Sequence, residues 1–181
     1  RLVDGAAKGS NDDVFAYFGT SSGGGDVDMY TMDALDQRAN LRFSPEVLTA
    51  INRWWEVTQD LLFTNGKSER GLDEDDYCAL FKRVYKTMVP VFDEDEANHC
   101  VSADWHHDSH GDGFCEKREF FNAVFELVDT WTKTTMASEY VEFLAFLLSN
   151  ITDGRNPPSL LPLKDISYSG DDLQMPHLHQ K

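Results

Sequence analysis

Apolar residues recur at helical spacing through most of residues 44–151, and this periodicity predicts an all-α fold. The first long helix is predicted to begin at Ser44, because a serine N-cap followed by a proline in the first turn is a typical start signal. The apolar stripe of this helix consists of Val47, Leu48, Ile51, Trp54, Trp55, Leu61 and Leu62. A stripe along one helical face predicts packing against other helices.

Two later helices share one pattern, with apolar residues one, four, five and eight positions after an acidic residue. One helix follows Asp76 and the other follows Glu119. Their stripes are Tyr77, Leu80, Phe81 and Val84 in the first, and Phe120, Ala123, Val124 and Leu127 in the second. Before the second loop, helical spacing is kept by Ala97, Cys100, Val101 and Trp105. The repeat predicts two helix–loop–helix units.

The two ends of the chain differ from this pattern. Residues 1–43 are predicted to form an N-terminal arm, with short helices at Asp12–Phe18 and Tyr30–Arg38. Residues 152–181 contain prolines, which favour an extended chain, together with scattered apolar residues. We therefore expect a C-terminal strap that either lies along the domain or recruits a partner.

The last predicted helix, residues 136–151, is apolar on nearly every side. A helix of this composition must be buried. We assign it to the same domain as the two helix–loop–helix units, which then spans residues 44–151.

The twelve residues Asp108–Glu119, DSHGDGFCEKRE, place oxygen-bearing groups at the spacing that surrounds a calcium ion. Calcium takes about six to eight oxygen ligands, and a glycine at the sixth position lets the chain fold back on the ion. Gly113 holds that position, and Cys115 is the apolar residue two positions later. The candidate ligands are Asp108, His110, Asp112, the Phe114 carbonyl, Glu116 and Glu119. The sequence therefore predicts one site, with Ca²⁺ as its ion.

One candidate ligand departs from the pattern, because His110 stands where an oxygen-bearing side chain is usual. Imidazole suits transition metals better than calcium. The remaining groups still provide about six ligands if Glu119 gives both oxygens and Glu116 binds directly or through water. We expect a weakened site, with a Kd of about 10⁻⁵ to 10⁻⁴ M. The helix before the loop is also unusual, since His107 and Asp104 hold positions that are usually apolar, which predicts that this helix enters rotated.

An upstream segment, Asn65–Asp76, fits the same twelve positions but lacks their chemistry. Lys67 and Arg70 place cations inside this loop, and Coulomb repulsion opposes the binding of a metal ion there. We interpret the segment as a structural half-site. Its predicted role is to pair with the downstream loop through Leu72 and Cys115.

On these residues, the segment 44–129 resembles an EF-hand pair of the calmodulin superfamily, with an inactive first loop and an active second loop. The resemblance implies calcium sensing, buffering or scaffolding. Two functions follow from it: a calcium-responsive regulator that acts through protein–protein contact, and a constitutive interaction module that calcium only stabilises. The helix at 136–151 would either fill the groove that such pairs open for targets or dock onto a partner protein. Intramolecular burial is favoured because a free apolar helix aggregates.

The composition of the chain restricts the classes of partner and the cellular compartment that we expect for it. The formal net charge of −16 argues against nucleic acid and anionic membranes as partners, and no stretch reaches the roughly 20 apolar residues of a membrane span. Three cysteines without framework spacing, and no secretory signal in the visible chain, favour a reduced cytoplasmic setting. Residues 120–148 are also similar to EF-hand proteins of ciliated and flagellated eukaryotes, which implies a cilium or flagellum as one location.

Two other functions are disfavoured. A transition-metal site would draw on His99, Cys100, His106, His107, His110 and Cys115. However, Gly111 and Gly113 break the helical spacing of these residues, and no C-x-x-C pair supports a structural zinc. An enzyme is also not expected, because no nucleophile-elbow, phosphate-loop or kinase-type motif is present.

Overall fold

The computed structural model describes residues 31–62 and 70–170 of the chain. This part is mostly helical, as predicted. Its helices are α2 (Met32–Leu41), α3 (Pro45–Leu62), α4 (Glu74–Met88), α5 (Glu94–Asp108), α6 (Lys117–Trp131) and α7 (Ala137–Ile151). The shorter elements are the strands β1 (Gly71–Leu72) and β2 (Cys115–Glu116) and the 3-10 helix η2 (Leu163–Asp165).

The predicted helix at Tyr30–Arg38 is observed as α2, which begins and ends later in the chain. The reason is the N-cap: the Thr31 hydroxyl accepts a hydrogen bond from the Ala34 amide at 3.2 Å, so the helix begins after Thr31. The other predicted N-terminal helix, Asp12–Phe18, lies outside the described residues.

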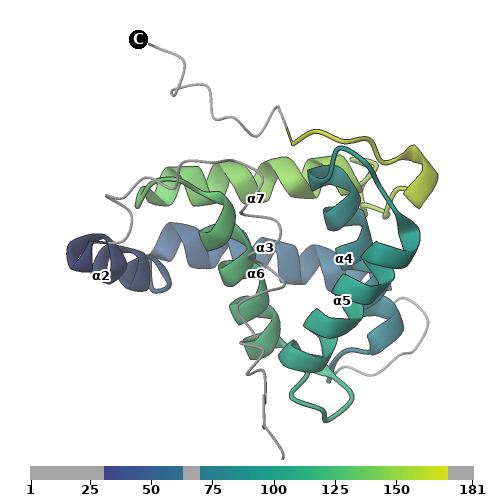
Figure 1. Cartoon of the computed structure of the whole chain (residues 1–181), viewed down its shortest axis with the longest axis horizontal. Helices are drawn as coiled ribbons and strands as arrows, with labels where there is room; N and C mark the ends of the chain where they lie inside the picture. Colours follow the sequence, from purple (N-terminus) through teal and green to yellow (C-terminus); the bar gives the residue numbers. More distant parts are fainter. Residues whose placement is uncertain (1–30, 63–69, 171–181) are drawn as a thin grey trace, which may run out of the picture.

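Four of the helices form two helix–loop–helix units, α3 with α4 and α5 with α6 (Figure 1). A short antiparallel pairing of β1 with β2 joins the loops of the two units. Leu72 pairs with Cys115, and both side chains are fully buried. The predicted contact between the two loops is therefore confirmed. This arrangement is compatible with a pair of EF-hands.

The pairing requires a glycine beside Leu72. A Cβ atom added to Gly71 would lie 2.4 Å from the carbonyl oxygen of Cys115, so any side chain would push the two loops apart. Gly71 and Leu72 of the upstream segment thus lie directly against the downstream loop.

Most of the predicted apolar stripes form the core. The eight apolar residues predicted to follow Asp76 and Glu119 are all buried, as are Val47, Ile51, Trp54 and Trp55 of α3. Three residues of the predicted α3 stripe are exceptions: Leu48 is 37% exposed, and Leu61 and Leu62 at the end of the helix are only partly buried. The face of α5 that turns inward contains Ala97, Val101, Trp105 and Asp108. His107 is exposed, as expected of a helix that enters rotated.

Helix α7 packs against the rest of the protein with one face buried, which confirms the packing predicted for residues 136–151, while its other face and Met136 are partly or fully exposed. It runs alongside α3 and also contacts α4 and α6 (Figure 1). Tyr140, Leu144 and Leu147 are fully buried there. The indole nitrogen of Trp54 donates a 2.9 Å hydrogen bond to the Leu144 carbonyl, which fixes α7 against α3. Among the described helices, none is long and apolar enough to cross a membrane.

The segment that follows α7 lies along α4 as far as it is described. The Arg83 guanidinium donates to the Leu161 carbonyl, and the Lys86 ammonium donates to the Leu163 carbonyl, both at 2.7 Å. Further along, the Ser169 amide donates to the Thr87 carbonyl at 2.9 Å, while Ile166 is buried in the core. The expected strap therefore lies on the domain between residues 152 and 170.

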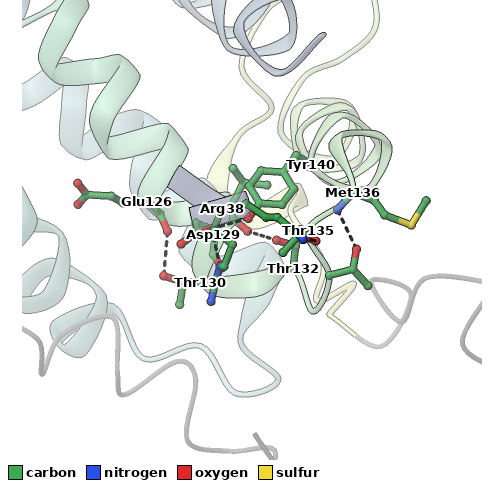
Figure 2. Close-up of polar contacts among 11 residues, drawn as sticks. Arg38, Glu126, Asp129, Thr130, Thr132, Thr135, Met136 and Tyr140 are labelled. Atoms are coloured by element: carbon green, nitrogen blue, oxygen red, sulfur yellow. Dashed lines mark hydrogen bonds and ion pairs between the residues drawn. The ribbon is translucent and has the colours of Figure 1, made fainter. Parts of the chain in front are cut away.

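Helix α2 is fastened to the rest of the protein by Asp129 of α6, as Figure 2 shows. The Arg38 guanidinium donates to the Asp129 carboxylate at 2.9 Å and also contacts the Asp129 carbonyl. The hydroxyl of Tyr140 donates to the same carboxylate. Burial, with a smaller contribution from this hydrogen bond, raises the pKa of Tyr140 to about 12. One carboxylate thus joins α2, α6 and α7.

Candidate metal centre

The loop Asp108–Glu119 occupies the whole connection between α5 and α6. Asp108 is the last residue of α5, and Glu119 lies in the first turn of α6. The backbone turns back on itself at His110, Gly111 and Gly113, whose φ angles are +52°, +80° and +85°. Glycine takes this conformation without steric cost, and histidine is among the few other residues that adopt it.

Asp108, the first candidate ligand, is buried and accepts a hydrogen bond from the other helix–loop–helix unit. The Tyr77 hydroxyl, in the first turns of α4, donates to one Asp108 carboxylate oxygen at 2.5 Å. The Nδ1 atom of His107 lies 3.0 Å from the other oxygen. Burial and the nearby Asp108 charge raise the pKa of Tyr77 well above its usual value, so the phenol keeps its proton. Asp108 therefore couples α5 to α4.

His110, the candidate ligand that departs from the pattern, is exposed. Its Nδ1 atom lies 3.1 Å from the carbonyl oxygen of Asp108. In this conformation the imidazole folds back on the backbone of its own loop.

Asp112 and Glu116, two further candidate ligands, share one partner from the upstream loop. The Arg70 guanidinium donates to an Asp112 carboxylate oxygen at 2.7 Å and to a Glu116 carboxylate oxygen at 2.8 Å. The same guanidinium lies over the Phe114 ring, 5.1 Å from its centroid. The other Asp112 oxygen accepts from the Phe114 amide at 3.2 Å. A cation from one loop thus bridges two carboxylates of the other.

Glu119, the last candidate ligand, is buried and helps to cap α6, in whose first turn it lies. One of its carboxylate oxygens accepts a 2.7 Å hydrogen bond from the Glu116 amide. The Glu116 side chain in turn accepts from the backbone of the first turn of α6, which completes a capping box. The start of α6 and the end of the loop are therefore held by the same two carboxylates.

The carboxylates of the loop create one negative region. The pKa of the Cys115 thiol is held far above its usual value. Burial is the largest cause, and the negative charges of Asp108, Glu119 and Asp112 add to it. Carboxylate and carbonyl oxygens are the donors that calcium prefers, so this donor set fits the ion by its chemistry, His110 excepted.

The carboxylates of the loop are hydrogen-bonded to other groups of the protein. Within residues 31–62 and 70–170, no three His, Cys, Asp or Glu side chains are gathered as they would be around a metal ion. Instead, the carboxylates of the loop accept hydrogen bonds from the Tyr77 hydroxyl, the Arg70 guanidinium and backbone amides. The residues considered for a transition metal are also spread out: Cys115 is buried in the bridge, while His99 and His106 are exposed on α5.

Arg70 and Tyr77 were not identified as site residues from the sequence. In the sequence, Arg70 indicates only an obstacle to metal binding in its own loop. The pairing of Gly71 with Glu116 brings it beside the downstream carboxylates, so the expected bridge register was the signal that could have found it. Tyr77 was assigned only to the apolar stripe of its helix, and its hydroxyl carried no separate signal.

Asp104, one turn before the loop, gives a testable pH dependence. Burial, assisted by the Asp108 charge and opposed by His107, raises the pKa of Asp104 from 3.8 to about 7. The folded chain therefore holds this proton between about pH 4 and pH 7 while the unfolded chain does not, and stability falls as pH rises through this window. Asp104→Asn is expected to raise the free energy of unfolding at pH 8 by about 1 to 2 kcal/mol.

Urea denaturation with chelator present, at about pH 5 and about pH 8, checks this expectation. Glu142→Gln, at an exposed position on α7, is the control and should leave the pH dependence unchanged. An equal gain at both pH values in Asp104→Asn would refute the role of the Asp104 charge.

Comparison with known proteins adds no relative. No protein-family model matches the chain, and searches of curated proteins and of solved structures give no significant match. The helical architecture and the bridge between the loops stand on the structure itself, and the EF-hand assignment stays a prediction from the loop chemistry.

Proposed function

We propose that this chain binds one calcium ion through the loop Asp108–Glu119 and acts as a calcium-responsive regulator by changing its contacts with a partner protein. The observation that carries the proposal is the paired-loop architecture. A glycine-turned loop with four carboxylates is held beside a second, cation-bearing loop through Leu72 and Cys115. Paired loops of this kind are compatible with EF-hands, in which oxygen atoms of a loop surround the ion.

The residues that would hold the ion are Asp108, Asp112, Glu116 and Glu119, with the carbonyl of Phe114. Calcium, when bound, supplies positive charge that offsets the mutual repulsion of these carboxylates. The side chain of His110 is not required for about six oxygen ligands.

The hydrogen bond from Tyr77 to Asp108 provides a route for a response. Tyr77 belongs to α4 and Asp108 to α5, so the bond crosses from one helix–loop–helix unit to the other. A change in what the Asp108 oxygens accept alters the contact between α4 and α5. The response then reaches helices that do not belong to the calcium loop.

Helix α7 limits how far the helices can move. Tyr140, Leu144 and Leu147 are fully buried against the two units, and a wide opening would expose them to water. We therefore expect a modest rearrangement on calcium binding, smaller than an opening that exposes a deep apolar groove.

A second candidate function is a constitutive interaction module in which calcium adds only stability. The observation that favours it is that the carboxylates of the loop already have protein partners, including Arg70 and Tyr77. A loop whose carboxylates already accept hydrogen bonds from the protein can keep its conformation without an ion. Binding would then raise stability by mass action without changing the exposed surface.

Calcium titration followed together by calorimetry and by an apolar fluorescent dye separates the two functions. Binding accompanied by a small rise in dye fluorescence supports the regulator. Binding with unchanged fluorescence supports the constitutive module. Absence of any binding heat at saturating calcium would refute the proposed ion.

His110→Asp is expected to tighten calcium binding by about threefold to tenfold, because an oxygen donor replaces an imidazole at the third loop position. Aspartate is also tolerated at a positive φ angle such as the +52° of His110. Calorimetric titration measures the change. The control is His106→Asp, which adds the same charge at an exposed position on α5, outside the loop. Equal tightening in both variants would show that added negative charge, not ligation, is responsible.

A further inference from the structure

Arg70 belongs to the loop that lacks calcium chemistry, yet its side chain serves the other loop. It donates to Asp112 and Glu116 at 2.7 and 2.8 Å, and both are candidate calcium ligands. The bridge between the loops positions it, since the adjacent Gly71 pairs with Glu116. A single guanidinium therefore occupies the space between two carboxylates that a cation would otherwise join.

The contact is specific in geometry although each ion pair is partly exposed. The side-chain exposures are 48% for Arg70, 43% for Asp112 and 46% for Glu116, and single ion pairs at such positions contribute little. Arg70, however, engages both carboxylates and lies over the Phe114 ring, so its planar group is held from three sides. Lysine, with one point charge, could not reproduce this bridge.

A calcium ion at the loop would compete with the guanidinium for the carboxylates of Asp112 and Glu116. A divalent ion at the loop would repel the Arg70 charge, and the carboxylates cannot direct the same lone pairs at both cations. An ion bound at the loop would therefore weaken the contact of Arg70 with at least one of its two partners, which lie at 2.7 and 2.8 Å.

We infer that Arg70 is a built-in competitor of calcium, a tethered cation by which the upstream loop lowers the affinity of the downstream loop and is itself released when the ion binds. The inference rests on the proposed calcium site and adds its regulation. It gives the upstream loop a second role besides its structural one: the cation that prevents metal binding in one loop also regulates binding in the other.

The test is calorimetric calcium titration of the full chain carrying Arg70→Gln, Arg70→Lys or Arg118→Gln. Arg70→Gln is expected to lower the Kd about threefold to tenfold. Arg118→Gln removes the same charge from an exposed arginine near the end of the loop, and should change the Kd by less than about twofold because solvent and salt screen it. Arg70→Lys keeps the charge but loses the bridge, so its Kd should lie between those of the wild type and Arg70→Gln.

A second measurement follows Arg70 itself. The NMR signal of its Nε–H group should exchange slowly with water in the presence of chelator, and faster once calcium saturates the protein. Circular dichroism of each variant shows that the fold is retained. Both readouts are independent of any downstream activity.

The outcomes separate this inference from the proposed function. Binding by the wild type with an unchanged Kd in Arg70→Gln would overturn the competitor role and leave the calcium site standing. Binding by Arg70→Gln but not by the wild type would support both, with Arg70 as a complete block. No binding by either protein would overturn both. An equal gain in Arg70→Gln and Arg118→Gln would overturn the bridge in favour of net charge.

Discussion

Replacing Leu144 with alanine is expected to lower the free energy of unfolding by about 3 kcal/mol. Leu144 is fully buried in the contact between α7 and α3, and its removal loses apolar burial and leaves a cavity. The Trp54 hydrogen bond to the Leu144 carbonyl is a backbone contact, so the substitution leaves it available. The loss therefore measures the side-chain packing that fixes α7 on the two units. Urea denaturation monitored by tryptophan fluorescence gives the value.

Leu148→Ala is the matched control for this effect. Leu148 lies on the same helix one turn later, but it is only partly buried at the edge of the core. The same substitution should cost about 1 kcal/mol there, because less apolar surface returns to water. Equal losses in both variants would contradict the placement of α7, since the fully buried and the partly buried position would then contribute alike.

Glu119→Gln is expected to weaken calcium binding by about tenfold to a hundredfold. The twelfth loop position supplies two carboxylate oxygens to calcium, and an amide offers a single neutral one. The substitution is suited to the site because the amide oxygen can still accept the hydrogen bond from the Glu116 amide. The cap at the start of α6 then survives, and the loss of affinity is not a loss of fold.

Glu126→Gln provides the comparison for Glu119→Gln. It removes one carboxylate from the same helix at a site whose partner is Arg42, at 3.4 Å and away from the loop. Calcium affinity should change by less than about twofold in this variant. Similar weakening in both variants would mean that the total charge of α6, and not ligation by Glu119, determines binding.

The helices could be predicted from the sequence because the residue patterns that mark them are local. Residues such as Leu80 and Phe120 follow the helical period, and the start of α3 is signalled by Ser44 and Pro45. Pairing of the two loops through Leu72 and Cys115 followed from placing both segments on one twelve-position pattern, and it is observed. Packing of residues 136–151 against the rest of the protein followed from a composition too apolar for a fully solvated helix, although one face stays partly exposed.

The side-chain partners could not be predicted, because they depend on tertiary contacts and rotamers. Arg38 meets Asp129, and Arg70 meets Asp112, across long sequence separations with no local pattern between them. Whether the Asp108 carboxylate faces an ion or the Tyr77 hydroxyl likewise depends on how α5 is rotated against α4. The pattern of the loop therefore indicates which oxygens are available, while the fold decides what they contact.

The most direct test of the central claim is the number of calcium ions bound per chain, measured by equilibrium dialysis at free calcium well above the expected Kd. The account predicts close to one ion per chain in the wild type and, at about ten times the wild-type Kd, about half an ion or less in Glu119→Gln. No bound ion in the wild type, or an equal number in Glu119→Gln, would contradict a calcium site at Asp108–Glu119.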